Sequence, residues 1–210
     1  MLLPRTPSLF SFLFKNILFR VKTSEKHVFL SFDDGPNPLV TPWVLHLLQS
    51  YNFKATFFLI GKNALEFPEI VRNIQSHKHQ IGNHSLNHKN AFKTSLQEYL
   101  DDVDAGQNAL ESLAIKTKLF RPPYGKLTNK AFQKIKFKSR IVLWDIISED
   151  YGNKKSEVLL RKLIRQTRPG SIVVFHDSEK CFQTLQELLP KYLDYLKKEG
   201  YLSKAIEQSY

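Results

Sequence analysis

The sequence predicts an α/β fold in which helices cross a parallel sheet, and three observations lead there. Apolar runs of strand length alternate with stretches of helical spacing throughout residues 27–210. No linker, repeat or composition break divides the chain. That alternation fits either a (β/α) barrel or an open doubly wound sheet. Reactive side chains follow successive predicted strands, and the carboxyl ends of barrel strands share one face, so we favour the barrel. These side chains are Asp33, Asp34, His84, Arg121, Asp145, Asp150 and His176.

The first strand is the apolar run at residues 28–30, which leads into Ser31, Phe32, Asp33 and Asp34. Gly35, Pro36 and Pro38 end it. Similar β-prone runs predict the later strands. They are expected at residues 55–60, 80–81, 118–121, 141–147 and 171–175.

Helical spacing of apolar residues predicts the elements between these strands. The clearest case is 95–114, where a stripe of leucines, Tyr99 and Val103 follows the helical period. Ser156 is a candidate N-cap, and Pro190 is expected to kink or split the last helix. The helices are expected at residues 40–51, 68–77, 95–114, 129–136, 156–168 and 182–198.

Composition narrows the class of protein. A chain of 210 residues is most simply one domain with a large core. The single cysteine, Cys181, excludes an internal disulfide and a zinc site built from cysteines. The net charge of +11 suits anionic partners, but the lysines are scattered. The densest run, 126–140, carries six charges without an aromatic stacking pattern, so we expect no nucleic-acid partner. We also expect a monomer.

The first 26 residues form a separate segment. Apolar stretches at 9–14 and 17–19 are interrupted by Pro4, Arg5, Pro7, Lys15 and Asn16. No run reaches transmembrane length, and no cleavage site follows an uninterrupted apolar stretch. We expect an amphipathic helix over 1–20 that packs on the domain, with contact to a membrane surface as the alternative. A cytoplasmic and an envelope-associated location both stay open.

Two histidines and the aspartate pair point to a metal. His84 and His88 stand four residues apart, so on a helical turn their imidazoles would share a face. Asp34 is the candidate third ligand, which would leave coordination positions open for water and substrate. Zinc is the default, with cobalt, manganese, iron or nickel as alternatives. The same two-histidine, one-carboxylate set also suits non-haem Fe(II) oxygenases.

Five motifs, in order, resemble those of the NodB-homology polysaccharide deacetylases, carbohydrate esterase family 4. They are SFDDGP (31–36), HSLNH (84–88), RPPYG (121–125), WDIISEDY (144–151) and VVFHD (173–177). The resemblance implies a distorted (β/α) barrel of about seven strands. It also implies metal-dependent removal of N-acetyl, or O-acetyl, groups from a glycan such as peptidoglycan.

The resemblance also assigns roles to the motif residues. Asp33 would be the general base for attack by a metal-activated water, and His176 the general acid. Arg121 would orient Asp33, and Asp150 would hold Arg121 or tune His176. The neighbouring Asp177 is a further candidate for carboxylate support of His176. Tyr124 would offer a backbone N–H to the oxyanion, with Pro122, Tyr151 and Trp144 near the substrate.

Two positions depart from the family pattern. Ile147 stands where the fourth motif often has a second Asp, and Tyr151 stands where it often has Trp. Asp150 is retained in that motif. By the resemblance, Tyr151 would add a hydroxyl to the wall of the acetyl pocket, which bears on substrate preference and not on the reaction.

Other readings compete with a peptidoglycan deacetylase. Chitooligosaccharide and acetylated xylan are alternative substrates for the same chemistry. An Fe(II) oxygenase would not need Asp33 or His176, whereas a hydrolase needs both. A binding protein without activity would be expected to have lost these catalytic positions, and both are present.

Overall fold

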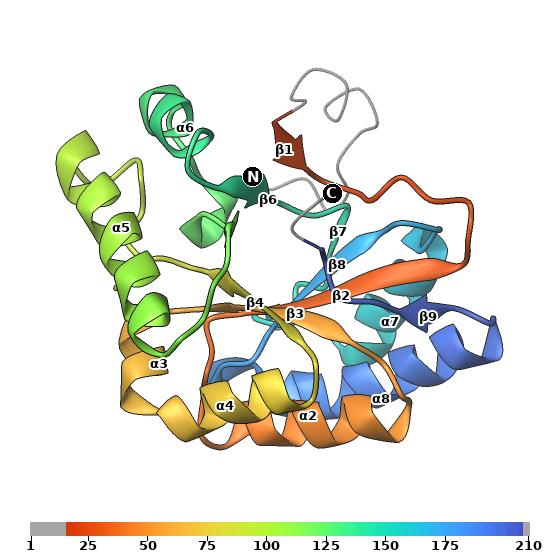
Figure 1. Cartoon of the computed structure of the whole chain (residues 1–210). Helices are drawn as coiled ribbons and strands as arrows, with labels where there is room; N and C mark the ends of the chain where they lie inside the picture. The colour runs from red at the N-terminus through yellow and green to blue at the C-terminus, as the bar shows by residue number, and fades with distance from the viewer. Residues whose placement is uncertain (1–15, 208–210) are drawn as a thin grey trace.

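The computed structural model describes residues 16–207, whose strands form a curled, mainly parallel sheet (Figure 1). Eight strands follow the order β1-β6-β5-β4-β3-β2-β8-β7, and β9 pairs with β2 in parallel. Every pair along the path is parallel, so the carboxyl ends of the strands lie at one end of the sheet. The strands are β1 (Ile17–Leu18), β2 (His27–Asp33), β3 (Ala55–Leu59), β4 (Gln80–Asn83), β5 (Leu119–Phe120), β6 (Arg140–Val142), β7 (Ile146–Ile147), β8 (Ile172–His176) and β9 (Leu202–Ser203).

Helices cover the outer side of this sheet. Figure 1 shows α2, α4 and α8 beneath the central strands, with α5 and α6 at one side. The α-helices are α2 (Val40–Ser50), α3 (Gly61–Glu66), α4 (Pro68–Ser76), α5 (Leu96–Ser112), α6 (Asn129–Ile135), α7 (Ser156–Gln166) and α8 (Phe182–Lys198). Two short 3₁₀ turns, η1 (Pro123–Gly125) and η2 (Glu179–Cys181), follow β5 and β8. The expected distorted barrel is therefore confirmed, with eight strands on its path rather than about seven.

The curl of the sheet follows from one short connection. β6 lies near one end of the strand order and β7 at the other, yet residues 143–145 alone join them. Four Cα steps separate Val142 from Ile146, and an extended chain covers at most about 14 Å in that distance. The two ends of the sheet must therefore curve toward each other. The single strand expected at 141–147 is wrong, because Leu143, Trp144 and Asp145 carry the chain between the edges.

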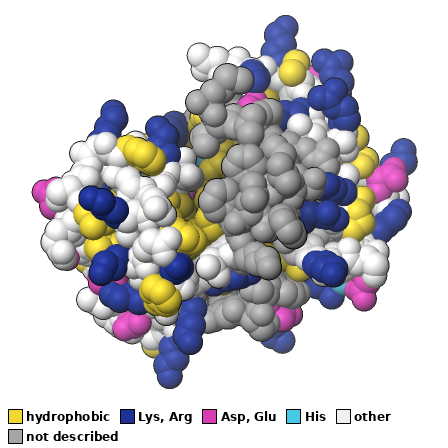
Figure 2. Space-filling view, turned by 90° about the horizontal axis from the view of Figure 1, so that it is seen from above, with side chains coloured by type: hydrophobic (Ala, Val, Ile, Leu, Met, Phe, Trp, Pro, Cys, Tyr) yellow, Lys and Arg dark blue, Asp and Glu magenta, His cyan; other side chains and the backbone are white. Residues whose placement is uncertain are grey.

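Basic side chains are scattered over the surface. Figure 2 shows Lys and Arg distributed across the upper face rather than gathered in one patch. Among the described residues on that face, this distribution agrees with the scatter read from the sequence.

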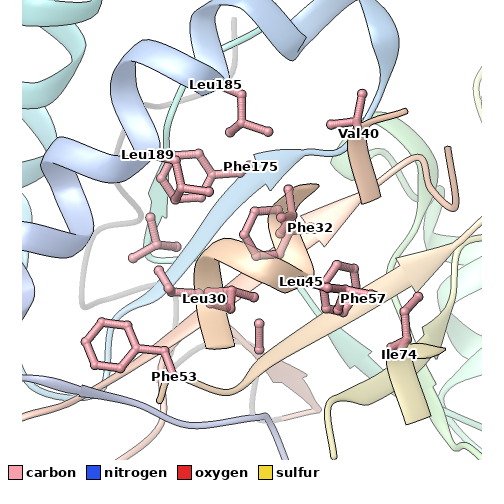
Figure 3. Close-up of a cluster of buried hydrophobic side chains, with 14 of the residues drawn as sticks. Leu30, Phe32, Val40, Leu45, Phe53, Phe57, Ile74, Phe175, Leu185 and Leu189 are labelled. Carbon is pink, nitrogen blue, oxygen red and sulfur yellow. The ribbon is translucent and has the colours of Figure 1, made fainter. Parts of the chain in front are cut away.

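Alternation along the strands separates two cores. Val28, Leu30 and Phe32 of β2 point outward into the core beneath the helices. The Phe32 ring stacks between Phe57 and Phe175, at centroid distances of 5.2 and 5.8 Å (Figure 3). The intervening Phe29 faces a second core inside the barrel. Successive strand residues point to opposite faces, so Ser31 and Asp33 share the inner side with Phe29.

Several local expectations differ from the structure. α3 was not expected: the residues after β3 form this short helix. Ser156 is not an N-cap; Lys155 occupies that position, and the Ser156 hydroxyl donates to Glu187 instead. Pro190 does not split α8, which runs unbroken from Phe182 to Lys198. A proline in a helix forfeits one backbone bond, and here Leu188, Leu189, Tyr192 and Leu193 around it are all buried in the core.

The N-terminal expectation is tested only at its end. Residues 1–15 lie outside the described residues. Ile17 and Leu18 form β1, which pairs with β6, so this part is a strand and not a helix. Within residues 16–207 no helix combines the length and apolar character that crossing a membrane requires.

Candidate active site

An acidic and a basic side chain meet where β2 and β8 end. Asp33 and His176 are directly opposed in the β2–β8 register. Neighbouring strands are about 4.8 Å apart, so the two residues are immediate neighbours on the inner face. Asp33 is buried, and His176 is partly buried. The strand pattern itself thus brings a carboxylate and an imidazole to one point.

The next residue, Asp34, faces both predicted histidine ligands. Its Oδ1 lies 3.3 Å from Nε2 of His88 and 3.7 Å from Nε2 of His84. One ligand atom from each of the three residues lies within 4.8 Å of the others. Asp34 has a φ of 79°, which is uncommon outside glycine, and Asn63 donates to its carbonyl at 2.9 Å. The backbone therefore turns sharply at Asp34, and a strained turn is frequent at functional sites.

His84 and His88 come together in a loop and not on a helical turn, so that expectation is wrong. Ser85 and His88 both have positive φ, and the Ser85 hydroxyl accepts from the His88 backbone N–H at 3.0 Å. α5 holds the loop from outside: the Asp102 carboxylate accepts from Asn87 at 2.7 Å. A Cβ on Gly106 would lie 2.5 Å from the Ser85 carbonyl carbon, so only glycine permits this close packing.

The imidazole of His84 is arranged to bind a cation. Its Nδ1 lies 2.7 Å from the Arg121 carbonyl oxygen, which can only accept, so Nδ1 carries the proton. Nε2 therefore presents a lone pair toward Asp34. Burial, and then the neighbouring His88, lower the pKa of His84 to about 3, and burial also lowers the pKa of His88. Both rings are thus neutral near pH 7, the form that binds metals. Two neutral imidazoles and a carboxylate fit a divalent metal such as zinc.

Arg121 holds Asp33 from inside the barrel. Its guanidinium is fully buried and donates from one terminal nitrogen to Asp33 at 2.6 Å and to the Ser31 hydroxyl at 2.9 Å. The remaining donors reach the carbonyls of Val142 and Leu143, and the group lies 4.0 Å from the centre of the Phe58 ring. This network fixes the position of one oxygen of Asp33 by a charge-assisted hydrogen bond.

Asp150 pairs with His176 and not with Arg121. Its Oδ1 lies 2.7 Å from His176 Nδ1, and its Oδ2 accepts from the His176 backbone N–H at 2.8 Å. Burial lowers the pKa of His176, but the charge and hydrogen bond of Asp150, helped by Asp33 and Asp34, outweigh it and raise that pKa to about 9. Of the two roles expected for Asp150, the structure gives it the contact with His176.

Asp177 supports the loop after β2 instead of His176. It follows His176 along the strand, so its side chain points to the other face. Its carboxylate accepts from the Gly35 N–H at 3.1 Å and from the Thr41 hydroxyl at 2.5 Å. Burial raises the pKa of Asp177 to about 7. A Cβ on Gly35 would lie 2.2 Å from one of its oxygens, so this close approach requires glycine.

These groups surround a cavity of about 260 Å³. Trp144, Tyr124 and Tyr151 form aromatic walls: the Tyr124 ring packs on His88 at 4.4 Å, and Tyr151 meets His176 edge-on at 5.1 Å. Pro122 is buried behind the wall and accepts from the Gly125 N–H. The full lining is Asp33, Asp34, His84, His88, Tyr124, Gly125, Trp144, Ile147, Tyr151, His176 and Lys180.

The structure places the residues predicted for catalysis, substrate contact and metal binding at this cavity or in contact with its lining, with two corrections and one addition. Asp145 is buried away from the cavity, where it accepts two hydrogen bonds from Arg168. The supposed link between Asp150 and Arg121 is replaced by the pair with His176. Lys180 was missed, because it follows the last motif and no sequence signal marks it.

The arrangement is suited to hydrolysis of an acyl group. The Asp33 carboxylate sits beside a cation site, and a protonated imidazole, His176, stands next to it across the same cavity. A base to deprotonate water and an acid to protonate a leaving group are the two groups that such a reaction requires. The apolar walls leave room for a small acyl group between them.

Comparison with known proteins agrees with this geometry. Residues 20–138 match the family model described as polysaccharide deacetylase. A peptidoglycan-N-acetylglucosamine deacetylase of Bacillus cereus is 32% identical over 188 residues, which are 88% of each chain. A chitooligosaccharide deacetylase of Azorhizobium caulinodans is 34% identical over 161 residues, covering 75% of this chain and 77% of its own. The solved structure of the Bc1960 peptidoglycan N-acetylglucosamine deacetylase superposes with a TM-score of 0.87 at 31% identity, over 96% of this chain and 95% of that one.

Proposed function

The chain belongs to the polysaccharide deacetylase family and acts as a deacetylase of glycans, and from that premise we propose that it hydrolyses N-acetyl groups of a cell-wall glycan such as peptidoglycan. One observation carries the proposal. Asp33, the Asp34–His84–His88 set and His176 line a single cavity large enough for an acetamido group.

Asp34, His84 and His88 would hold one divalent cation, with zinc as the first candidate. When bound, such an ion lowers the pKa of a coordinated water and polarises a carbonyl oxygen. Both histidines are in the form that binds a cation. The Arg121 carbonyl fixes the His84 tautomer, and burial keeps both rings neutral.

Asp33 is the general base in this proposal. Arg121 binds one of its oxygens at 2.6 Å, which leaves the other free to accept a proton from the attacking water. Because the guanidinium is fully buried and stacked on Phe58, it keeps the carboxylate in one orientation. Arg121 is therefore a positioning residue, which acts through Asp33.

His176 is the general acid. An amine leaves as a poor anion unless it is protonated, so cleavage of an amide requires a donor at the nitrogen. Asp150 holds Nδ1 of His176 and keeps the ring protonated, which directs Nε2 toward the cavity. Asp33 and His176 are adjacent across β2 and β8, so a base and an acid face the same acetyl group from neighbouring strands.

The walls define the place of the acetyl group. Tyr124 lies at the cavity mouth with a φ of 60°, and its backbone N–H is the candidate donor to the developing oxyanion. Trp144, Ile147 and Tyr151 enclose the space with largely apolar surface, which fits a methyl group. The residues at positions 147 and 151 are the family departures, so they are the candidates for tuning substrate preference.

Chitooligosaccharide and acetylated xylan are the alternative substrates, and the first is the named substrate of a relative. An Fe(II) oxygenase accounts for the three ligands but leaves the Arg121–Asp33 and Asp150–His176 pairs without a purpose.

The test is acetate release by the purified protein, with zinc, cobalt or manganese added. The substrates are peptidoglycan, N-acetylglucosamine oligomers and acetylated xylan. We expect metal-dependent release, fastest from the N-acetylated cell-wall glycan. Release from xylan alone would overturn the choice of N-acetyl groups, and no release from any substrate would overturn the proposed function.

A further inference from the structure

The cavity has one lysine in its lining, and the proposed reaction makes no use of it. Lys180 follows β8 in η2 and reaches the cavity from the rim. Within the described part of the chain, no carboxylate forms an ion pair with its ammonium group. The acidic side chains of the same lining have other partners: Asp33 pairs with Arg121, and Asp34 lies against His84 and His88.

The backbone beneath Lys180 is firmly held. Its neighbour Cys181 is fully buried, and the Cys181 backbone N–H donates to the Ser178 carbonyl at 3.0 Å. Phe182, the next residue, packs edge-on against Trp43 at 5.6 Å. The preceding Asp177 is tied to the loop after β2. This turn fixes the point at which the Lys180 side chain leaves the backbone, beside the cavity that it lines.

Lys180 shares its cavity with the proposed reacting groups. Asp33, Asp34 and His176 line the same cavity as Lys180, whose exposed side chain remains open to a substrate. A sugar with its acetyl group beside Asp33 would extend its ring substituents toward this rim.

We propose that Lys180 selects glycans that carry a carboxylate close to the acetylated sugar. The inference rests on the proposed function and names the substrate class more closely. A carboxylate would give Lys180 the ion pair that the protein does not provide, whereas a neutral oligosaccharide would leave the ammonium solvated. In peptidoglycan two carboxylates have this chemistry: the lactyl group of a muramic acid without a peptide stem, and the free acids of the stem itself.

The test compares three substrates of matched length. They are glycan strands freed of peptide stems by an amidase, strands that keep their stems, and neutral N-acetylglucosamine oligomers. The variants are Lys180→Gln, Lys180→Glu and the conservative Lys180→Arg, with Lys134→Gln as a control on the exposed side of α6.

We expect the ratio of kcat/KM for the acidic over the neutral substrate to fall about three- to tenfold in Lys180→Gln. It should fall further in Lys180→Glu, stay near the wild-type ratio in Lys180→Arg and not move in Lys134→Gln. The wild-type preference should weaken as salt is raised, because the pair is partly exposed. Binding of the stem-free strands to the metal-free protein should weaken in the same order. If the loss falls on the stem-free strands, Lys180 recognises the lactyl carboxylate. If it falls on the strands that keep their stems, Lys180 recognises the free acids of the stem.

Equal losses on acidic and neutral substrates, or no change on either, would overturn the selection by charge. These results differ from failure of the proposed function, in which the wild-type protein releases no acetate from any of the three substrates.

Discussion

Asp150→Asn tests how the protein sets the charge on His176. The amide keeps the shape of the carboxylate and its capacity to accept from the His176 backbone N–H, which the carboxylate accepts at 2.8 Å. It removes the negative charge 2.7 Å from the imidazole. That charge is the largest cause that raises the pKa of His176 to about 9, against burial, which lowers it. Without it, the pKa should fall to the ordinary value of 6.5 or below.

The expected loss of activity follows from the fraction of His176 that stays protonated at the assay pH. A general acid must be protonated, so activity is present below its pKa and is lost as the pH rises through it. At pH 7.5 a group with a pKa of about 9 is almost fully protonated, whereas one with a pKa of about 6.5 is protonated about one time in ten. We therefore expect kcat for acetate release to fall about tenfold at pH 7.5 and to recover near pH 5.5. A bound cation would lower the pKa of His176 in both proteins. The difference between the two pH profiles is therefore the quantity to measure.

The assay is the pH dependence of kcat for both proteins with equal metal content. Glu149→Gln is the matched control, since it removes the neighbouring carboxylate, which pairs with the exposed Lys154 and the partly buried Lys162 and not with His176. The same linkage acts on stability: a raised pKa stabilises the fold below the unfolded value, and this is lost as the pH rises through about 9. Asp150→Asn should therefore lower Tm more at pH 6 than at pH 10. An unmoved basic limb with wild-type kcat at pH 7.5 would refute this reasoning.

Three further variants test other parts of the site. His88→Ala should lose bound metal and activity together while circular dichroism stays unchanged, because the cores do not include this residue; elemental analysis showing full metal occupancy would contradict the ligand assignment. Asp33→Asn should keep its metal but lose about 10²–10⁴-fold in kcat, the range for a positioned base; wild-type turnover with metal bound would place the base elsewhere. Gly35→Ala should destabilise the protein by about 1–3 kcal/mol in denaturant unfolding, since its Cβ would lie 2.2 Å from an Asp177 oxygen; an unchanged midpoint would show that the Asp177 carboxylate can move aside.

Much of the site could be predicted because motif residues stand at strand ends. Asp33 and His176 each close an apolar run, and parallel strands bring such ends together. The alternation of strand side chains even explains why Asp177 is not the partner of His176: adjacent residues point to opposite faces. The partner is Asp150, which lies 26 residues earlier in the chain but approaches in space.

Other features depend on contacts that local patterns do not report. Residues 141–147 read as one apolar strand, yet the pairing of Ile141 with β1 and of Ile146 with β8 divides them between two edges. The four-residue spacing of His84 and His88 is equally compatible with a helix and with a loop. Contacts with Asp102 and Gly106 of α5 stabilise the loop, and neither residue is part of the local pattern around the two histidines.

Isotope transfer from water tests the central claim, that these residues catalyse hydrolysis of an acetyl group, most directly. The metal-loaded protein is incubated with an N-acetylated cell-wall glycan in H₂¹⁸O, and the products are analysed by mass spectrometry. The account predicts acetate that carries one ¹⁸O per turnover, an unlabelled glycan with a free amine, far slower product formation after Asp33→Asn, and loss of product formation on chelation. Acetate without label, or a glycan that has gained oxygen, would contradict attack by water at the acetyl carbon.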